Sequence, residues 1–452
     1  MTEPRDTVQI PAVIVTPPAA EPPCDTTEPG APDVPAPPEP QRVADTGLSE
    51  SFLNELCLKH VYFGGALEAI ELADNLRLDY RIVTALLDWL KQQELVTTRG
   101  GSGAFGGAKL RYGVTERGHK VVTEILARDN YRGPAPVPFA HFCRQVELQR
   151  LGDLALTADA LERAFGDLVL EPEMLQLLGP AIIAARSLFL YGAPGNGKTA
   201  IAERIIRGLR GRVFVPYAVL IDNEIVRVYD PAYHSPEGAE AEEPTAARHD
   251  RRWVYSRRPA VSAGGELTLD MLEVVASPHV TYYEAPFQVK ATSGVLFIDD
   301  FGRQRCDPAA LLNRWTQALE NQLDFLTFRS GHKARVPFDC LVVFSTNLDP
   351  RALADEAFLR RIRYKVAVAD PTERAFKQIF RRECAAHGIA YDEAAVDHLL
   401  AAHYRARRRP LRACHPRDLV QQLRDIQRFT GELPPLTPAT MDRVAALYFV
   451  GD

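Results

Sequence analysis

The chain has no pair of cysteines at Cys-x-x-Cys spacing. Its seven cysteines are scattered over 452 residues, so we expect reduced thiols rather than a cysteine-based zinc site or a disulfide framework. No apolar run approaches the roughly 20 residues that a membrane-spanning helix needs. The N-terminus lacks a basic stretch followed by an apolar one, so we expect no secretory signal and a cytoplasmic protein without membrane partners.

A strong net charge is also missing. The 53 Lys and Arg residues nearly balance the 59 Asp and Glu residues, which leaves a net charge of −6. That balance gives no overall bias toward nucleic acid or an anionic membrane. Hydrophobic residues make up 46% of the chain and charged residues 25%, which are the proportions of a soluble globular protein. A chain of this length is expected to form two or three domains.

Composition separates three segments in the first third of the chain. Residues 1–45 are crowded with Pro, Glu, Ala and Thr and cannot bury enough apolar surface to order themselves, so we expect a disordered tail. Residues 46–130 carry helical spacing followed by a glycine-rich turn between two strand-like runs, the order of a winged helix. Residues 131–159 include a Pro-rich connector and are expected to be a linker.

Two further domains follow. Over residues 160–369 helices alternate with short apolar strands, and this alternation predicts an α/β fold with a parallel sheet and crossover helices. Residues 370–452 carry four helical stretches and no strand, which predicts a C-terminal helical domain. The predicted strands are "SLFLYG", "VFVPYAVLI", "GVLFIDD", "CLVVFSTN" and "RYKVAVA".

A glycine-rich motif lies between the first of these strands and an amphipathic helix. It matches G-x-x-x-x-G-K-[ST] in the structural context that this motif requires. The glycines let backbone N–H groups point at phosphate oxygens, and the helix N-terminus adds its dipole. Lys198 is expected to reach the β and γ phosphates of ATP, and Thr199 to supply a hydroxyl to Mg²⁺. The expected nucleotide-binding residues are Gly192, Ala193, Pro194, Gly195, Asn196, Gly197, Lys198, Thr199 and Ala200.

The strand "GVLFIDD" ends in two adjacent carboxylates, Asp299 and Asp300. Desolvating paired like charges is costly. The glycine-rich motif over residues 192–199, a P-loop, gives a reason to keep them, because a bound nucleotide brings a cation. Asp299 is expected to hold Mg²⁺ through its water shell, and Asp300 to polarise the water that attacks the γ-phosphate. Asp is one methylene shorter than Glu, so the attacking water has to lie closer to Asp300 or be bridged to it. The alternative is a solvated strand end.

Together these motifs make residues 160–450 resemble the AAA+ ATPase superfamily. "CLVVFSTNLDP" resembles its sensor 1 strand, so Asn347 is expected to help position the attacking water. "DEAFLRRIRYK" resembles the helix end that carries the arginine finger, with Arg361 as the best match and Arg360 as the competing choice. In this family the C-terminal helical domain acts as a lid on the nucleotide site.

Two other segments fit the same resemblance. "ACHPRDLVQQL" resembles the sensor 2 helix, which makes Arg417 the expected contact to the γ-phosphate. "FGDLVLEPEML" resembles the segment that lines the adenine pocket through backbone atoms of Gly166 and Asp167. The basic run 404–412 before the sensor 2 helix is interpreted either as a phosphate contact or as an exposed interhelical loop.

The sequence has features of more than one clade of the superfamily. A long segment before the paired carboxylates, and a β-hairpin expected over 324–339, resemble MoxR-type and enhancer-binding activator ATPases. The Asp-Asp-x-Gly end instead resembles DnaA-like initiators and helicase or transposase loaders. Within the long segment, residues 229–259 are either a solvated loop or a partner-contacting one.

Three functions are compatible with the resemblance. The first is a homo-oligomeric ring, by family a hexamer, that hydrolyses ATP to remodel an unknown protein partner as a chaperone does. The second is a DNA-directed regulator that reads DNA through its winged helix, and the third is an ATP-binding switch with low turnover. DNA binders usually present a clear basic face, whereas the presumed recognition helix offers Arg81 and Lys91 against three acidic residues. We therefore expect the winged helix to dock a protein and disfavour DNA.

Overall fold

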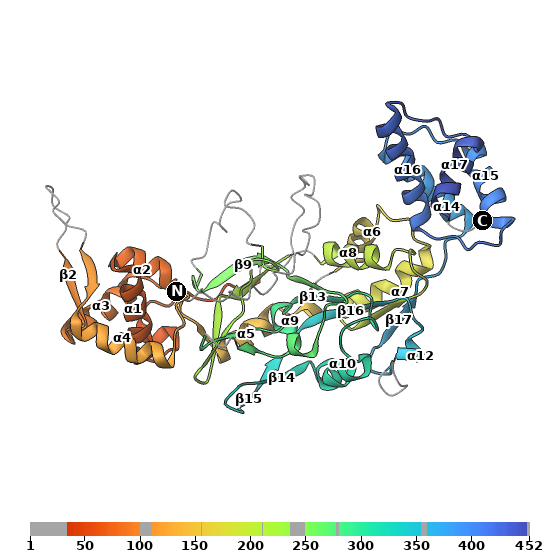
Figure 1. Ribbon diagram of the computed structural model, residues 1–452. Helices are drawn as coiled ribbons and strands as arrows, with labels where there is room; N and C mark the ends of the chain where they lie inside the picture. Colours follow the sequence, from red (N-terminus) through yellow and green to blue (C-terminus); the bar gives the residue numbers. More distant parts are fainter. Residues whose placement is uncertain are drawn as a thin grey trace, which may run out of the picture.

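The structure, a computed structural model, describes residues 34–99, 110–154, 156–209, 211–235, 249–276, 280–353 and 359–449. Three regions follow one another along the molecule: an N-terminal helical domain, a central region built on two sheets, and a C-terminal helical domain (Figure 1). The expected tail up to residue 33, the glycine-rich turn over 100–109 and residues 236–248 lie outside the described ranges. Within those ranges, no helix has both the length and the apolar character needed to cross a membrane.

The N-terminal domain packs four helices against a small antiparallel sheet. Its elements are α1 Glu50–Gly64, β1 Ala66–Glu68, α2 Ala69–Leu76, α3 Tyr80–Gln92, β2 Val96–Arg99, β3 Arg111–Val114 and α4 Glu116–Arg128, with the strand order β1-β3-β2. Ser49 and Asp79 cap α1 and α3 by accepting hydrogen bonds from backbone N–H groups of the first turn. The helices and the hairpin lie where the sequence predicts them, and β1 is an additional strand.

Residues 34–45, the end of the segment expected to be disordered, pack against the central region. The amide of Gln145 donates to the carbonyl of Pro35, and the N–H of Asp250 donates to the carbonyl of Pro37. Proline-rich backbone keeps its carbonyl acceptors, so partners supplied by another segment can order it without a core of its own.

Arg252 connects this region to the N-terminal domain. Its buried guanidinium pairs with Asp250 and also donates to the carbonyls of Thr46 at 3.0 Å and Pro136 at 3.1 Å. A buried cation is tolerated only when its donors are satisfied. Arg252 therefore holds together the segment that enters the N-terminal domain, at Thr46, and the segment that leaves it, at Pro136.

A five-stranded parallel sheet lies at the centre of the chain and confirms the predicted α/β class. In spatial order its strands are β10 Ala260–Ala263, β13 Gly294–Ile298, β16 Cys340–Thr346, β5 Leu188–Tyr191 and β17 Tyr364–Ala367. Alternate side chains of β13 enter two apolar clusters, one on each face of the sheet. The helices of this region are α6 Ala158–Ala164, α7 Pro172–Ile183, α8 Lys198–Gly208, α10 Pro308–Arg314, α11 Thr316–Asn321 and α12 Pro350–Leu353.

The predicted strand "VFVPYAVLI" does not belong to this sheet. It is divided at Tyr217 into β6 Arg212–Pro216, which pairs antiparallel with β9 Trp253–Arg257, and β7 Ala218–Ile221. The edge of the parallel sheet is occupied instead by β10, whose short Ala-Val-Ser-Ala sequence forms no conspicuous apolar run. An apolar run predicts a buried strand but does not specify the sheet that it joins.

A second sheet, together with the β6–β9 pair, forms an insert before the strand of the paired carboxylates. In spatial order its strands are β11 Val275–Ala276, β12 Tyr283–Glu284, β8 Glu224–Arg227, β7 and β4 Val137–Pro138, and the short helix α9 Phe287–Lys290 follows β12. β4 and the next helix, α5 Phe139–Leu148, come from the segment expected to be a linker. Val137, Phe142 and Val146 are buried in the core of the insert, so part of this segment is structural.

The hairpin expected over 324–339 is confirmed. Its strands are β14 Leu323–Thr327 and β15 Lys333–Pro337, paired antiparallel. Alternate residues Leu326, Ala334 and Val336 are buried in the core of the insert, which is why the hairpin lies against the second sheet.

The C-terminal domain is entirely helical in the part that the structure describes, as predicted. Its elements are α14 Glu373–Ala386, α15 Glu393–Leu399, a π-helical segment Leu400–Arg405, α16 Cys414–Thr430 and α17 Pro438–Tyr448. Apolar residues from all of these elements share one separate core.

Candidate nucleotide-binding site

The carboxyl ends of β5, β13 and β16 meet at one edge of the parallel sheet. The strand register pairs Tyr191 with Thr346, and Ile298 with Phe344. The residues that follow these strands are Gly192, Asp299 and Asn347, so the sheet brings together three segments that are far apart in sequence. This edge is where parallel α/β sheets bind ligands.

The glycine-rich loop has the backbone conformation that the motif predicts. Gly192, Gly195 and Gly197 all have positive φ angles, of 140°, 82° and 86°, a region that residues with a Cβ rarely adopt. A Cβ on Gly192 would lie 2.4 Å from the carbonyl oxygen of Val368. Since Gly197 is the N-cap of α8, the first N–H groups of that helix have no intrahelical acceptor. The loop therefore presents a row of amides that fits a phosphate group.

Lys198 is held across this loop. Its side chain is 5% exposed, and Nζ donates to Gly192 O and Ala193 O, both at 2.9 Å, and to Asn347 Oδ1 at 2.6 Å. Burial lowers the pKa of Lys198, and the nearby charges of Asp299 and Asp300 act in the opposite direction. All three acceptors are neutral oxygens, so the ammonium group has no directly bonded counter-charge among them. A bound phosphate would supply that counter-charge.

The paired carboxylates have different partners. Thr199 Oγ1 donates to Asp299 Oδ2 at 3.1 Å, whereas Asn347 Nδ2 donates to Asp300 Oδ1 at 3.0 Å. Asn347 thus links Lys198 to Asp300 through its two amide atoms. A hydroxyl and a carboxylate side by side are the hard oxygen donors that suit Mg²⁺, so Thr199 and Asp299 fit the predicted metal-binding role.

Asp300 is held in a left-handed backbone conformation, with φ of 48°. This conformation is unfavourable for a residue with a side chain and occurs at functional sites where the surroundings enforce it. The amide of Gln304 donates to the carbonyls of Asp299 at 2.9 Å and Asp300 at 3.1 Å. Sequence reasoning missed Gln304, because a polar residue after a strand has no distinguishing pattern.

The C-terminal domain contacts the glycine-rich loop directly. Asp370 Oδ1 accepts from Asn196 Nδ2 at 2.7 Å and also pairs with Arg412. The N–H of Cys414, the first residue of α16, donates to Gly195 O at 2.8 Å. A single carboxylate therefore joins the loop to the segment that leads into α16, and Arg412 of the basic run lies at the site.

The predicted sensor 2 residue lies apart from this contact. Arg417 is on the first turn of α16, but its side chain is 66% exposed and its Nε bonds to the adjacent Asp418 at 3.2 Å. The expected adenine-pocket segment lies between α8 and the helical domain, because Asp167 pairs with Arg204 and the carbonyl of Gly166 accepts from Arg382.

The two candidate finger residues also lie outside the loop. Arg361 Nε pairs with Glu320 Oε1 of α11 at 2.8 Å, and Arg360 is exposed. The structure does not bring these two together with the P-loop of the same chain.

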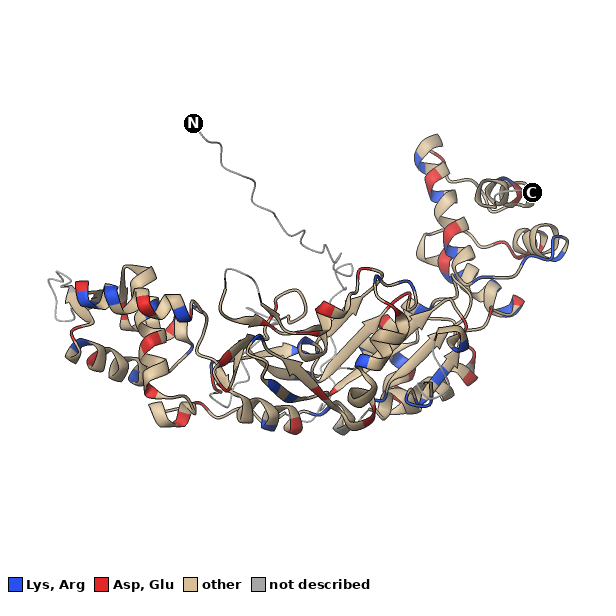
Figure 2. Cartoon of the chain, turned by 60° about the horizontal axis from the view of Figure 1, so that its bottom comes forward, with Lys and Arg blue, Asp and Glu red and all other residues tan. Residues whose placement is uncertain are grey.

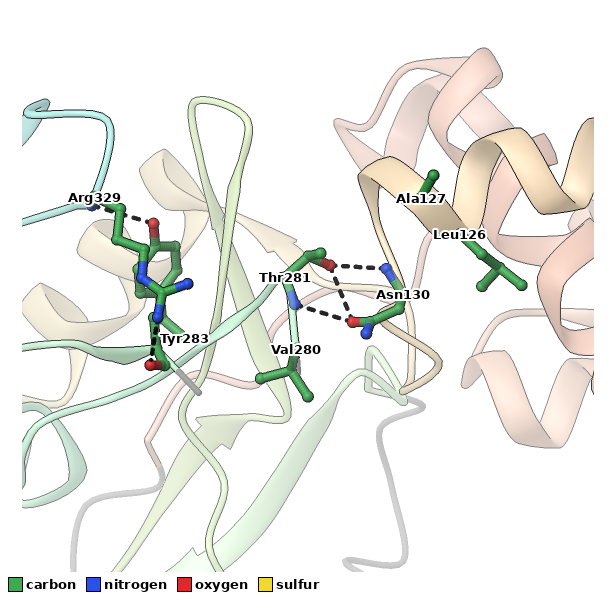
Figure 3. A pocket seen from close by; sticks show the side chains of 8 residues that line it. Leu126, Ala127, Asn130, Val280, Thr281, Tyr283 and Arg329 are labelled. Carbon is green, nitrogen blue, oxygen red and sulfur yellow. Dashed lines mark hydrogen bonds between the residues drawn. The ribbon is translucent and has the colours of Figure 1, made fainter. Parts of the chain in front are cut away.

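A cavity of about 400 Å³ lies elsewhere, where the N-terminal domain meets the insert. Figure 3 shows Asn130 and Thr281 joined by hydrogen bonds. Arg329 donates to the carbonyl of Ala276 at 2.8 Å. Among the described residues, its lining includes none of the predicted site residues. The candidate site is therefore the edge of the parallel sheet and not this cavity.

Comparison with known proteins gives one family match. Residues 372–447, which form most of the C-terminal domain, match a family model described as a domain of unknown function (DUF8689). No curated protein sequence matches the chain.

Several solved structures are similar to this chain. One is NtrX from Brucella abortus, at 15% identity over 62% of this chain and 57% of that chain, with a TM-score of 0.37. Another is the Thermotoga maritima RuvB Holliday junction branch migration motor, at 14% identity over 66% and 71%, with a TM-score of 0.34. The chain thus spans less than two thirds of NtrX. Likeness at this level carries no function, so the proposals below rest on the residues of this chain.

The contact between Asp370 and Arg412 should slow the local opening of the glycine-rich loop. Because the pair is partly exposed, we expect it to contribute about 1 kcal/mol, which corresponds to roughly fivefold faster amide exchange once it is lost. Hydrogen–deuterium exchange of the peptide containing Gly192 to Lys198 should therefore speed up in Arg412→Ala. The control Arg405→Ala removes an exposed cation that pairs with Glu373 of the same domain. Equal exchange in both variants would contradict the coupling.

Proposed function

We propose that this chain is an AAA+ ATPase that assembles into a homo-oligomeric ring, a hexamer by its resemblance to that superfamily, and uses Mg²⁺-dependent ATP hydrolysis to remodel a protein partner. The observation that carries the proposal is the hydrogen-bonded link from Lys198 through Asn347 to Asp300, beside the Thr199–Asp299 pair. The parallel sheet and the helical domain in contact with its P-loop support the family assignment.

Each of these residues has a defined task in the proposed reaction. Lys198 and the loop amides would bind the β and γ phosphates, and Thr199 with Asp299 would hold Mg²⁺. A carboxylate can accept a proton from water, so Asp300 would orient the water that attacks the γ-phosphorus. The bond from that phosphorus to the bridging oxygen then breaks, which releases phosphate and ADP. Asn347 holds the Asp300 carboxylate in place for this step.

The remaining predicted residues would complete the site from two directions. Arg417 lies on the first turn of α16, and the same helix begins with the Cys414 N–H bonded to the P-loop, which supports a contact to the γ-phosphate once nucleotide is bound. Arg361, with Arg360 as the alternative, would serve the P-loop of the neighbouring subunit, since a finger acts across a subunit boundary.

We further propose that the N-terminal domain is a winged helix that docks a protein. The element order α1-β1-α2-α3-β2-β3 with one antiparallel sheet supports this assignment. On α3, Arg81 is already paired with Asp79 and bonded to Gln41, and Tyr80 and Trp89 are exposed. Acidic and basic residues are interspersed over the domain (Figure 2). Exposed aromatic side chains among balanced charges suit a protein partner better than a phosphate backbone.

One alternative keeps a specific observation in its favour. The second acidic position is an Asp, and its shorter side chain is already bonded to Asn347. Slow turnover, as in an ATP-binding switch, would follow if Asp300 fails to reach the attacking water.

Asp300→Asn should bind ATP with wild-type affinity but lose hydrolysis by on the order of 100-fold or more, because an amide cannot accept the proton. Nucleotide binding and phosphate release measure the two effects separately. Lys198→Ala should lose ATP binding itself, and the exposed Asp270→Asn serves as the matched control that retains both activities. Wild-type hydrolysis by Asp300→Asn would exclude the proposed role of Asp300.

The full-length protein should bind random duplex DNA only weakly, even at about 50 mM salt, because few cations on its N-terminal domain are uncompensated. Arg81→Ala combined with Lys91→Ala should leave that weak binding unchanged. Filter binding over a salt series measures both the affinity and its salt dependence. Tight, salt-sensitive binding that this double variant abolishes would instead establish the DNA-directed function.

A further inference from the structure

Three potential metal ligands meet on one side of the C-terminal domain. His398 belongs to α15, His403 to the π-helical segment, and Asp442 to α17. The Nε2 atoms of His398 and His403 lie 2.8 Å and 2.7 Å from the same oxygen, Asp442 Oδ1. All the ligand atoms of this His398–His403–Asp442 cluster lie within 4.8 Å of one another. The cluster shares no residue with the nucleotide site.

The π-helical turn is what brings the two histidines together. In a regular α-helix, residues five apart are separated by about 140° around the axis and point to different faces. A π-helical turn is wider, because its hydrogen bonds join residues five apart, and it brings such residues closer to one face; π-helical turns are frequent at functional sites. The segment Leu400–Arg405 thus places His403 on the same side as His398. An α-helical continuation would have separated them.

The cluster is held on one side and open on the other. His403 is 12% exposed, and its Nδ1 is buried without a hydrogen-bond partner among the described residues. Asp442 is the polar side-chain partner of that ring, whereas Asp442 itself is half exposed. A further ligand, such as water, can approach from the solvent side.

We propose that His398, His403 and Asp442 bind a divalent transition-metal ion of the zinc class, with water completing the coordination. Two imidazole nitrogens and one carboxylate are a recurrent donor set for such ions. Tetrahedral ligands about 2.0 Å from zinc are separated from one another by roughly 3.3 Å. The two nitrogen–oxygen distances, of 2.8 Å and 2.7 Å, have to widen by about half an ångström to reach that spacing, and the half-exposed Asp442 can turn to allow it.

Metal binding would join α17 to the π-helical turn. The same turn leads toward the nucleotide site, because Arg409 donates to the carbonyl of His403 at 2.7 Å and Arg412 follows three residues later. The ion would therefore act as a structural crosslink in the lid, independently of ATP hydrolysis.

The test is zinc binding by the full-length protein after chelation, without nucleotide and with any histidine tag removed. Titration against a chromophoric chelator should give one tight zinc per chain, and cobalt in its place should give a visible absorption band. His398→Ala and Asp442→Asn should each weaken zinc binding on the order of 100-fold, since each removes a direct ligand. The matched control His387→Ala removes another partly buried histidine of the same domain and should bind zinc as the wild type does.

A conservative variant separates loss of a ligand from loss of folding. His398→Cys keeps a zinc ligand at this position and should retain most of the affinity that His398→Ala loses. Asp299→Asn removes the competing carboxylate of the nucleotide site and should leave the stoichiometry unchanged. Absence of stoichiometric zinc binding, or equal affinity in wild type and His398→Ala, would overturn the proposal and leave Asp442 as a hydrogen-bond acceptor for two histidines.

Discussion

The buried ammonium group of Lys198 is the charge on which the candidate site depends. Removing a cation from water is costly unless polar groups surround it. Here those groups come from the loop that Lys198 closes and from Asn347 at the end of a neighbouring strand. Asn347 then fixes Asp300, so the cation and the proposed base are positioned by one side chain. Strand register, loop conformation and charge thus have to be correct together for either residue to act.

The second dependence is between the P-loop and the helical lid. Asp370 accepts from Asn196 of the loop and from Arg412 of the lid, so the position of the P-loop is coupled to that of the lid. Sequence resemblance directs attention to Arg417, but Arg412 is the lid cation that the structure places at the loop. Arg412 holds the lid in this conformation, whereas Arg417 is the residue proposed to contact bound nucleotide.

Local patterns predicted the parts of the site that are contiguous in sequence. The P-loop, the paired carboxylates and Asn347 each follow a strand, and parallel pairing alone brings their positions to one edge. Other features depend on tertiary contacts that no local pattern encodes. The sequence of β10 gives a weak strand signal. The prolines of the 131–159 segment predict a linker, although the segment contains β4 and α5. Asp370 and Arg412 are far apart in sequence and meet only after folding. His398 and His403 have no α-helical spacing, so only the observed π-helix could align them.

The proposal that each ATP site is completed by the neighbouring subunit is tested most directly by a mixing experiment. Arg361→Ala and Lys198→Ala proteins are combined at varied ratios, and phosphate release is measured. Neither protein alone should hydrolyse ATP, whereas about a quarter of the interfaces in an equal random mixture would pair an intact P-loop with an intact finger. The account predicts activity that peaks in the mixture and is absent at both ends. Mixed oligomers that stay inactive at every ratio, for Arg361→Ala and for Arg360→Ala alike, would contradict it.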